Sequence, residues 1–208
     1  MRWFTALLPL ALALAFSLGC GDGTPTIPPP PSYDPEAMAK AALKDYDKDS
    51  NGLIEGPELE AVPALKSALT PIDKNQDKKL SKDELKDRFE AYKSLGAGAV
   101  AAPFEVVFNG EPLEGATVTF TPEGCMLGTV KTATTTTTAN GNGSTFMIDA
   151  QSFPGIPSGL YKISISKKDA SGNEILPERY NKSSSLGGEV FDGNRGSMTK
   201  LTFNLNAK

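Results

Sequence analysis

The chain has 208 residues, of which 39% are apolar and 22% are charged, and its net charge is -4. Its length, with a change of composition part-way along, fits two small domains and an export signal better than one large domain. The modest negative charge, without a basic cluster, argues against a nucleic-acid partner. The sequence contains no histidine, so it lacks the usual general base and the usual zinc ligand. We therefore expect a protein that is not an enzyme.

Residues 1–19 have the features of an export signal. Arg2 precedes an apolar run, residues 3–18, that is short for a membrane span but typical of a signal peptide. The stretch Ser17–Cys20 resembles a lipobox, where bacterial signal peptidase cuts before a cysteine that then carries lipid, although a lipobox usually has leucine where Ser17 stands. The resemblance implies an exported lipoprotein, attached to the membrane of the cell envelope through Cys20. The alternatives are an ordinary cleaved signal with an incidental cysteine, or a buried core segment.

Residues 20–32 include four consecutive prolines, Pro28–Pro31. Such a segment favours extended polyproline geometry, and we expect it to be a tether that holds the folded part away from the membrane. If Cys20 carries lipid, Cys125 has no partner for an internal disulfide. Without a histidine to activate it, we expect Cys125 to be a passive thiol.

Residues 47–58, DKDSNGLIEGPE, carry oxygen donors at the spacing of a calcium-binding loop. Calcium prefers six to eight oxygen ligands, and alternate residues of a tightly turned loop point inward. Gly52 permits the left-handed turn that other residues resist. An acidic surface turn with chance spacing is the alternative. The candidate ligands are Asp47, Asp49, Asn51, the carbonyl of Leu53, Glu55 directly or through water, and both carboxylate oxygens of Glu58.

Residues 73–84, DKNQDKKLSKDE, repeat this spacing with two departures. Lys78 stands where glycine is usual, so it must adopt a left-handed conformation at a cost of about 1 kcal/mol or more. Pro71 disfavours helix at the preceding residue and should shorten the helix that leads into the loop. The alternative is a degenerate loop that binds weakly or not at all. The candidate ligands are Asp73, Asn75, Asp77, the carbonyl of Lys79, Ser81 and Glu84.

The flanks of both loops predict helices, so residues 33–95 resemble an EF-hand pair. Asp34 can cap a helix that runs to Tyr46, and apolar residues recur at helical spacing after each loop. Ile54 and Leu80 occupy matching loop positions and should pair across a short bridge. A dockerin also has two close calcium loops, but the leading helix and the glutamates that end both loops favour EF-hands. The helical core residues we expect are Leu59, Val62, Leu65, Leu69, Leu85, Phe89 and Tyr92.

After a small-residue linker at 96–102, the sequence changes to short alternating stretches separated by turn residues, the pattern of an all-β fold. The threonine-rich run could instead be a glycosylated stalk, but the turn signal ANGNG that follows it favours strand, turn and strand. We expect Asn109-Gly110 to form a turn. The expected strands are residues 104–108, 116–121, 132–138, 144–148, 160–166 and 201–205.

Residues 103–208 also resemble the carboxypeptidase regulatory-like, transthyretin-type domain of exported bacterial proteins. The resemblance rests on NGEPLEGATVTFTPEG, TTTTTANGNGSTFMI, IPSGLYKISIS, LPERYNKSSSL and the last strand, TKLTFNLNAK. It implies an antiparallel β-sandwich of about seven strands and a non-catalytic module. The expected fold class is therefore multidomain, an α-helical EF-hand pair followed by an all-β sandwich. We expect residues 103–208 to fold alone.

The function we expect is that of a calcium-binding lipoprotein with a structural or interaction role, its partner a protein or a cell-envelope polymer. One alternative is a hydrolase that uses paired carboxylates. Another is a calcium sensor, which needs a methionine-rich face, whereas residues 33–95 contain only Met38. Four lysines oppose the acidic residues of the second calcium loop, so we expect the first to bind more tightly. The carboxylates available to a hydrolase are Glu123, Asp149, Glu174 and Glu189.

Replacing Cys20 with serine tests the lipobox. The variant Cys20→Ser cannot receive a thioether-linked lipid, so we expect an uncleaved precursor or a soluble protein. Membrane fractionation with immunoblotting distinguishes these forms. A mature-length variant that stays with the membrane would show that Cys20 is not the attachment point.

Overall fold

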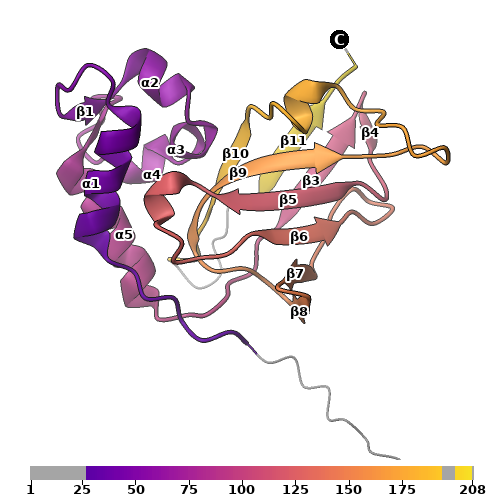
Figure 1. Ribbon diagram of the computed structural model, residues 1–208, viewed down its shortest axis with the longest axis horizontal. Helices are drawn as coiled ribbons and strands as arrows, with labels where there is room; N and C mark the ends of the chain where they lie inside the picture. Colours follow the sequence, from indigo (N-terminus) through magenta and orange to yellow (C-terminus); the bar gives the residue numbers. More distant parts are fainter. Residues whose placement is uncertain (1–26, 194–199, 208) are drawn as a thin grey trace, which may run out of the picture.

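A computed structural model describes residues 27–193 and 200–207, with helices first and mainly antiparallel sheets after them (Figure 1). The export signal and Cys20 lie outside the described residues. Within these two ranges, none of the helices combines the length and the hydropathy that a membrane span requires.

Five helices and a small bridge make up the first half. Asp34 accepts a hydrogen bond from the amide of Ala37 at 3.1 Å and caps the first helix, which confirms the expected start. Prolines interrupt the middle of this half: α3 begins at Pro63, and α4 contains Pro71 and is only four residues long. The elements are α1 (Pro35–Tyr46), β1 (Leu53–Ile54), α2 (Gly56–Glu60), α3 (Pro63–Ser67), α4 (Leu69–Ile72), β2 (Leu80–Ser81) and α5 (Lys82–Leu95).

Two sheets make up the second half. The larger sheet is antiparallel throughout, in the order β10-β9-β5-β6-β7-β8. Its strands are β5 (Thr117–Pro122), β6 (Ala133–Thr136), β7 (Phe146–Ile148), β8 (Gln151–Phe153), β9 (Gly159–Ser166) and β10 (Leu186–Val190). The smaller sheet, in the order β11-β3-β4, contains β3 (Phe104–Phe108), β4 (Glu111–Pro112) and β11 (Leu201–Leu205), and two 3₁₀ turns are η1 (Gly124–Met126) and η2 (Glu178–Tyr180).

Aromatic side chains fill the space between the two sheets. The ring centre of Phe104 in β3 lies 5.8 Å from that of Phe120 in β5, and the ring centres of Phe120 and Phe146 of β7 are 5.5 Å apart. Both pairs have edge-on geometry. These three rings are almost fully buried. Edge-on aromatic pairs contribute about 0.5–1.5 kcal/mol beyond the area they bury, so this cluster helps to hold the inward faces of the sheets together.

Each expected strand is present, but the sheets contain features that the alternation did not predict. Strands β4, β8 and β10 were not expected, because they are short or contain glycine and proline in place of β-branched residues. The expectation of a wholly antiparallel arrangement is wrong for one pair, since β11 runs parallel to β3. The amide of Leu201 donates to the carbonyl of Pro103 at 3.0 Å, so both strands start at the same end of the sheet.

Strand β10 allows close approach on both of its faces through consecutive glycines. A Cβ at Gly187 would lie 2.3 Å from the backbone nitrogen of Ala64 in α3, and one at Gly188 would lie 2.8 Å from the side chain of Leu201 in β11. The backbone contact at Gly187 leaves no room for a side chain, whereas one at Gly188 would require the end of the Leu201 side chain to move. The two glycines therefore allow the helical half to pack on one face of β10 and the smaller sheet on the other.

A largely buried ion pair joins the helical half to this strand. The guanidinium of Arg88 in α5 donates two hydrogen bonds, each 2.6 Å long, to the carboxylate of Glu189 in β10. The Tyr92 hydroxyl donates to the same carboxylate, and the guanidinium lies 4.3 Å from the ring centre of Phe191. The exposed fractions of the Arg88 and Glu189 side chains are only 15% and 10%, so separating the two halves would leave both charges without their partner.

The segments expected as linker and tether also contact the β half. In the segment 96–102, Val100 pairs with Ile156 and Ala102 is buried. The prolines Pro28–Pro31 border a cavity of about 340 Å³ together with residues of the β half. The Pro28 carbonyl lies so near Gly98 that a Cβ there would be 1.5 Å away. A fragment of residues 103–208 would lose these contacts, and its folding alone, unaffected by a chelator, stays a prediction.

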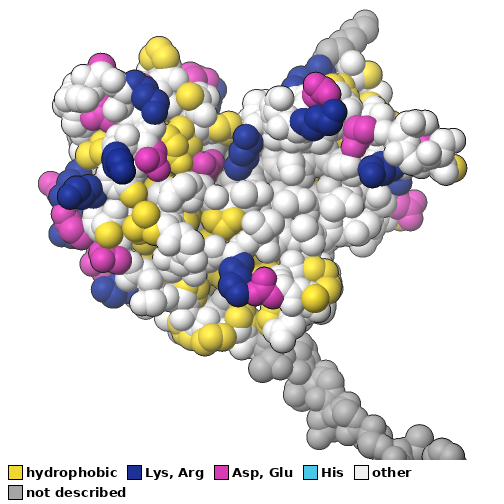
Figure 2. Space-filling model, in the orientation of Figure 1, with side chains coloured by type: hydrophobic (Ala, Val, Ile, Leu, Met, Phe, Trp, Pro, Cys, Tyr) yellow, Lys and Arg dark blue, Asp and Glu magenta, His cyan; other side chains and the backbone are white. Residues whose placement is uncertain are grey.

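Charged side chains are distributed unevenly over the surface. Figure 2 shows both signs intermixed over the helices, whereas the centre of the view, over β5, β6 and β9, carries few charges. In this part of the sheet, the register places Ser164, Thr119 and Thr134 in one row. This face therefore presents hydroxyl groups and no large patch of a single charge sign.

The Arg88–Glu189 pair yields a stability prediction. We expect Arg88→Ala to reduce the free energy of unfolding by about 3–5 kcal/mol, because it leaves a buried carboxylate short of its cation. The matched control is Lys86→Ala, since Lys86 pairs with Glu36 where both side chains are exposed. This substitution should cost less than about 1 kcal/mol. Urea unfolding measures both. Equal losses in the two variants would show that the pair does not stabilise the contact between the halves.

Candidate metal centre

Loop 1, residues 47–58, begins where α1 ends and runs into the first turn of α2. Asp47 follows the last turn of α1, and its amide donates to the carbonyl of Leu43 at 2.9 Å. Ser50 and Gly52 have φ values of 60° and 85°, so the backbone turns twice through the left-handed region. The turn at Gly52 was expected from the sequence, and the one at Ser50 was not.

Backbone amides hold the carboxylates of loop 1 at its two ends. Asp47 accepts from the amides of Asn51 and Gly52 at 3.2 and 2.9 Å. Glu58, from α2, accepts from the amides of Lys48 and Glu55 at 2.6 and 3.3 Å. These bonds fix the direction of both carboxylates before any ligand arrives.

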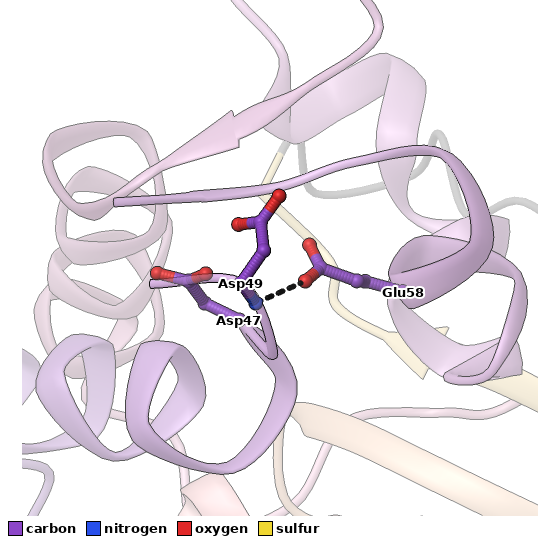
Figure 3. Close-up of side chains that lie close together, drawn as sticks. All are labelled: Asp47, Asp49 and Glu58. Carbon is purple, nitrogen blue, oxygen red and sulfur yellow. Dashed lines mark hydrogen bonds between the residues drawn. The ribbon is translucent and has the colours of Figure 1, made fainter. Parts of the chain in front are cut away.

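Three carboxylates of loop 1 converge, as Figure 3 shows. Asp47, Asp49 and Glu58 each offer an oxygen, and these oxygens all lie within 4.8 Å of one another. A cavity of about 370 Å³ adjoins them and is lined by Asp49, Glu55, Gly56, Pro57 and Glu58. Carboxylates this close repel one another, so a cation that enters between them would be bound favourably.

Loop 2, residues 73–84, repeats the amide-to-carboxylate hydrogen bonds at both ends of loop 1. Asp73 accepts from the amides of Asp77 and Lys78 at 3.2 and 2.8 Å. Glu84 accepts from the amides of Lys74 and Ser81 at 3.1 and 2.9 Å. The expected left-handed conformation of Lys78 is confirmed by its φ of 64°, and Gln76, at 62°, matches Ser50 of loop 1.

The strands β1 and β2 join the two loops. Ile54 pairs with Leu80 and Leu53 pairs with Ser81, which confirms the expected bridge. Ile54 and Leu80 are fully buried in the core. The Leu53 amide donates to the Asn51 side chain at 2.8 Å, and the Lys79 amide donates to Asp77 at 2.9 Å, so these residues follow the same path in the two loops.

The loops differ in how closely their carboxylates approach. Among the described residues, Asp73, Asp77 and Glu84 do not form a group as close as the one in loop 1. Burial of Glu84 acts to raise its pKa, but hydrogen bonds from the amide and hydroxyl of Ser81 and the amide of Lys74 outweigh this, so the pKa is lowered. Glu84 is thus held as a carboxylate at the start of α5.

The donor chemistry of loop 1 fits a hard cation. Its candidate ligands are carboxylate, amide and carbonyl oxygens, without the nitrogen or sulfur donors that zinc prefers. Calcium accepts such oxygen sets in flexible geometry, whereas magnesium demands a near-ideal octahedron and retains waters. The residues present therefore fit calcium best, and Asp47, Asp49 and Glu58 are those already brought together.

Sequence reasoning missed one contact of this site. The ammonium group of Lys79, in loop 2, forms an ion pair with the carboxylate of Glu55, in loop 1, at 2.5 Å. The two residues are adjacent to the paired residues Ile54 and Leu80. Extending that register by one residue would have placed them opposite each other.

Cys125 lies in η1 and is fully buried. Burial raises the pKa of its thiol to about 12, so the thiol stays protonated near neutral pH. A buried, protonated thiol is unreactive, which agrees with the passive role expected for this cysteine.

Comparison with known proteins adds little. No protein-family model matches the chain, and no curated protein matches it. Among solved structures, the major pilin subunit BcpA of Bacillus cereus matches with 16% identity and a TM-score of 0.31, covering 52% of this chain and 31% of the pilin. Its D312A variant gives a TM-score of 0.30 at 16% identity, covering 51% and 30%. The chain thus spans about a third of the pilin's length, and the likeness is too weak to support an argument.

The two loops should differ in a calcium titration. We expect Glu58→Gln to abolish the tighter phase, because it removes a charge from the group of converging carboxylates, and Glu84→Gln to leave that phase largely intact. Lys78→Gly should strengthen the weaker phase, since glycine adopts the left-handed turn without strain. Isothermal titration calorimetry measures each variant. If Glu84→Gln removes the tighter phase and Glu58→Gln keeps it, our ranking of the loops is wrong.

Proposed function

We propose that the chain is an exported, lipid-anchored calcium-binding protein with a structural or interaction role and no catalytic activity. In this proposal the helical half is an EF-hand pair and the β half is a transthyretin-type sandwich. Its attachment is to the membrane through Cys20, and its partner is a protein or a cell-envelope polymer. The observation that carries the proposal is the convergence of Asp47, Asp49 and Glu58 in a loop whose hydrogen bonds are repeated in a second loop.

Bound calcium would stabilise the fold by relieving the repulsion among the converging carboxylates of loop 1. The converging carboxylates lie in a loop whose ends are the C-terminus of α1 and the N-terminus of α2. A cation bound there would hold these two helix ends together, and any ligand that binds only the folded state stabilises it. Because the helical half packs on β10, we propose that this stabilisation extends to the β half.

A structural role fits the contacts better than a sensor role does. A calcium sensor opens its helix pairs and exposes a methionine-rich groove. Here Met38 is fully buried, α3 packs on β10 at Gly187, and α5 is held by the Arg88–Glu189 pair. Opening the helices would break these contacts.

The carboxylates available to a hydrolase each have a separate partner. Burial raises the pKa of Glu123, whose carboxylate accepts from the Tyr46 hydroxyl at 3.2 Å. Asp149 pairs with Lys131, Glu174 accepts from Ser166 at 2.5 Å, and Glu189 pairs with Arg88. No observation on these groups favours a paired-carboxylate mechanism over the calcium proposal.

Calorimetry and thermal melts of the soluble form, residues 27–208, test the proposal. Extracellular calcium modules commonly bind at about 10⁻⁴–10⁻³ M, and calcium at about 100 times the Kd stabilises the folded state by about 2.7 kcal/mol. For a chain of this size, that corresponds to a rise in Tm of roughly 5–10 °C. Magnesium should give a smaller rise, and EDTA should reverse both. If calcium produces no binding heat and no change in Tm, the proposal is wrong.

A further inference from the structure

Glu55 of loop 1 is shared between its own loop and Lys79 of loop 2. One carboxylate oxygen of Glu55 accepts a hydrogen bond from the Asn51 side chain at 3.0 Å. The other lies 2.5 Å from the Lys79 ammonium. Glu55 is the ninth residue of loop 1 and one of its candidate ligands, so a positive charge already contacts the carboxylate of a candidate ligand.

Because of the register between β1 and β2, only loop 1 has a lysine of the other loop beside its ninth residue. The loops are related by the pairing of Ile54 with Leu80 and of Leu53 with Ser81. Residue nine of loop 2 is Ser81, and its partner on the bridge is the uncharged Leu53. The same pairing therefore places a cation beside the ligands of loop 1 and none beside the corresponding position of loop 2.

Two other lysines of loop 2 form ion pairs away from loop 1. Lys74 pairs with Asp87 at 2.6 Å, and Lys82 pairs with Glu36. Both partners lie in helices outside the loops. Lys74 thus provides a matched control, because it carries the same charge in the same loop without contacting a loop 1 ligand.

We propose that Lys79 sets the calcium affinity of loop 1, an inference that rests on the calcium-binding function proposed above. Without an ion, the lysine offsets the charge of Glu55 beside the converging carboxylates and so helps to keep the loop folded. A divalent cation that uses this oxygen of Glu55 must displace the ammonium group, which weakens binding. The exposed fractions of the two side chains are 41% for Lys79 and 30% for Glu55, so salt should screen the effect.

Removing the charge with Lys79→Gln tests this inference by calorimetry. We expect the calcium Kd of loop 1 to fall roughly five- to ten-fold at low salt, the effect of one charge at a few ångströms in water-like surroundings. The difference in Kd between Lys79→Gln and the wild type should shrink toward zero at about 1 M salt, where the Debye length is about 3 Å. Lys74→Gln should change the Kd of loop 1 by less than about two-fold, because the distance to that site is greater.

A double-mutant cycle separates direct competition from a general charge effect. In a Glu55→Gln background, Lys79→Gln should lower the calcium Kd of loop 1 by less than about two-fold. The reason is that the side-chain oxygen at position 55, which the lysine would release, no longer carries a charge. A thermal melt in EDTA gives a second readout: Lys79→Gln should lower the Tm without calcium and recover it with calcium. An undiminished gain in the Glu55→Gln background would overturn the inference.

The outcomes also distinguish this inference from the function on which it rests. If the wild type binds calcium and Lys79→Gln binds with the same Kd, only the role of Lys79 is overturned. If neither protein binds calcium, both proposals fail. If the wild type shows no measurable binding and Lys79→Gln does, the competition is stronger than the expected five- to ten-fold and the inference stands.

Discussion

The geometry of both loops depends on one constraint, the pairing of the two-residue strands β1 and β2. Ile54 and Leu80 are fully buried and pair directly, so neither loop can shift its register without moving an apolar side chain out of the core. That register fixes the direction of the residues on either side. It aligns the two loops for the same set of amide-to-carboxylate hydrogen bonds, and it brings Lys79 to Glu55.

Local features of this chain could be predicted from the sequence because their causes are local. The helix that begins at Pro35, the left-handed Lys78, the short α4 and the bridge follow from caps, prolines and loop positions within a few residues. The convergence of Asp47, Asp49 and Glu58 agrees with their spacing, since alternate residues of a tight loop point inward.

Features that join distant segments could not be predicted. Strand β10 has little strand propensity. Its glycines matter only in the folded protein, where α3 and Leu201 pack against them. The parallel pairing of β11 with β3 depends on where the chain enters the smaller sheet. Arg88 and Glu189 are 101 residues apart in sequence, and nothing in the pattern around either residue indicates the other. The interface between the two halves is therefore a property of the tertiary structure alone.

The contacts of the proline run determine where a pulling force would enter the fold if the chain is anchored at Cys20. If the chain hangs from a lipid at Cys20, any pull enters through Pro28–Pro31 and reaches Tyr33, whose hydroxyl donates to the Ser158 carbonyl at 2.6 Å. The Pro28 carbonyl rests against Gly98, on the segment that connects the halves. Tension would first peel the prolines from the β half and then pull on the contact between Tyr33 and Ser158. Loops 1 and 2 lie beyond both points along the chain, so they would be shielded from the force until these contacts gave way.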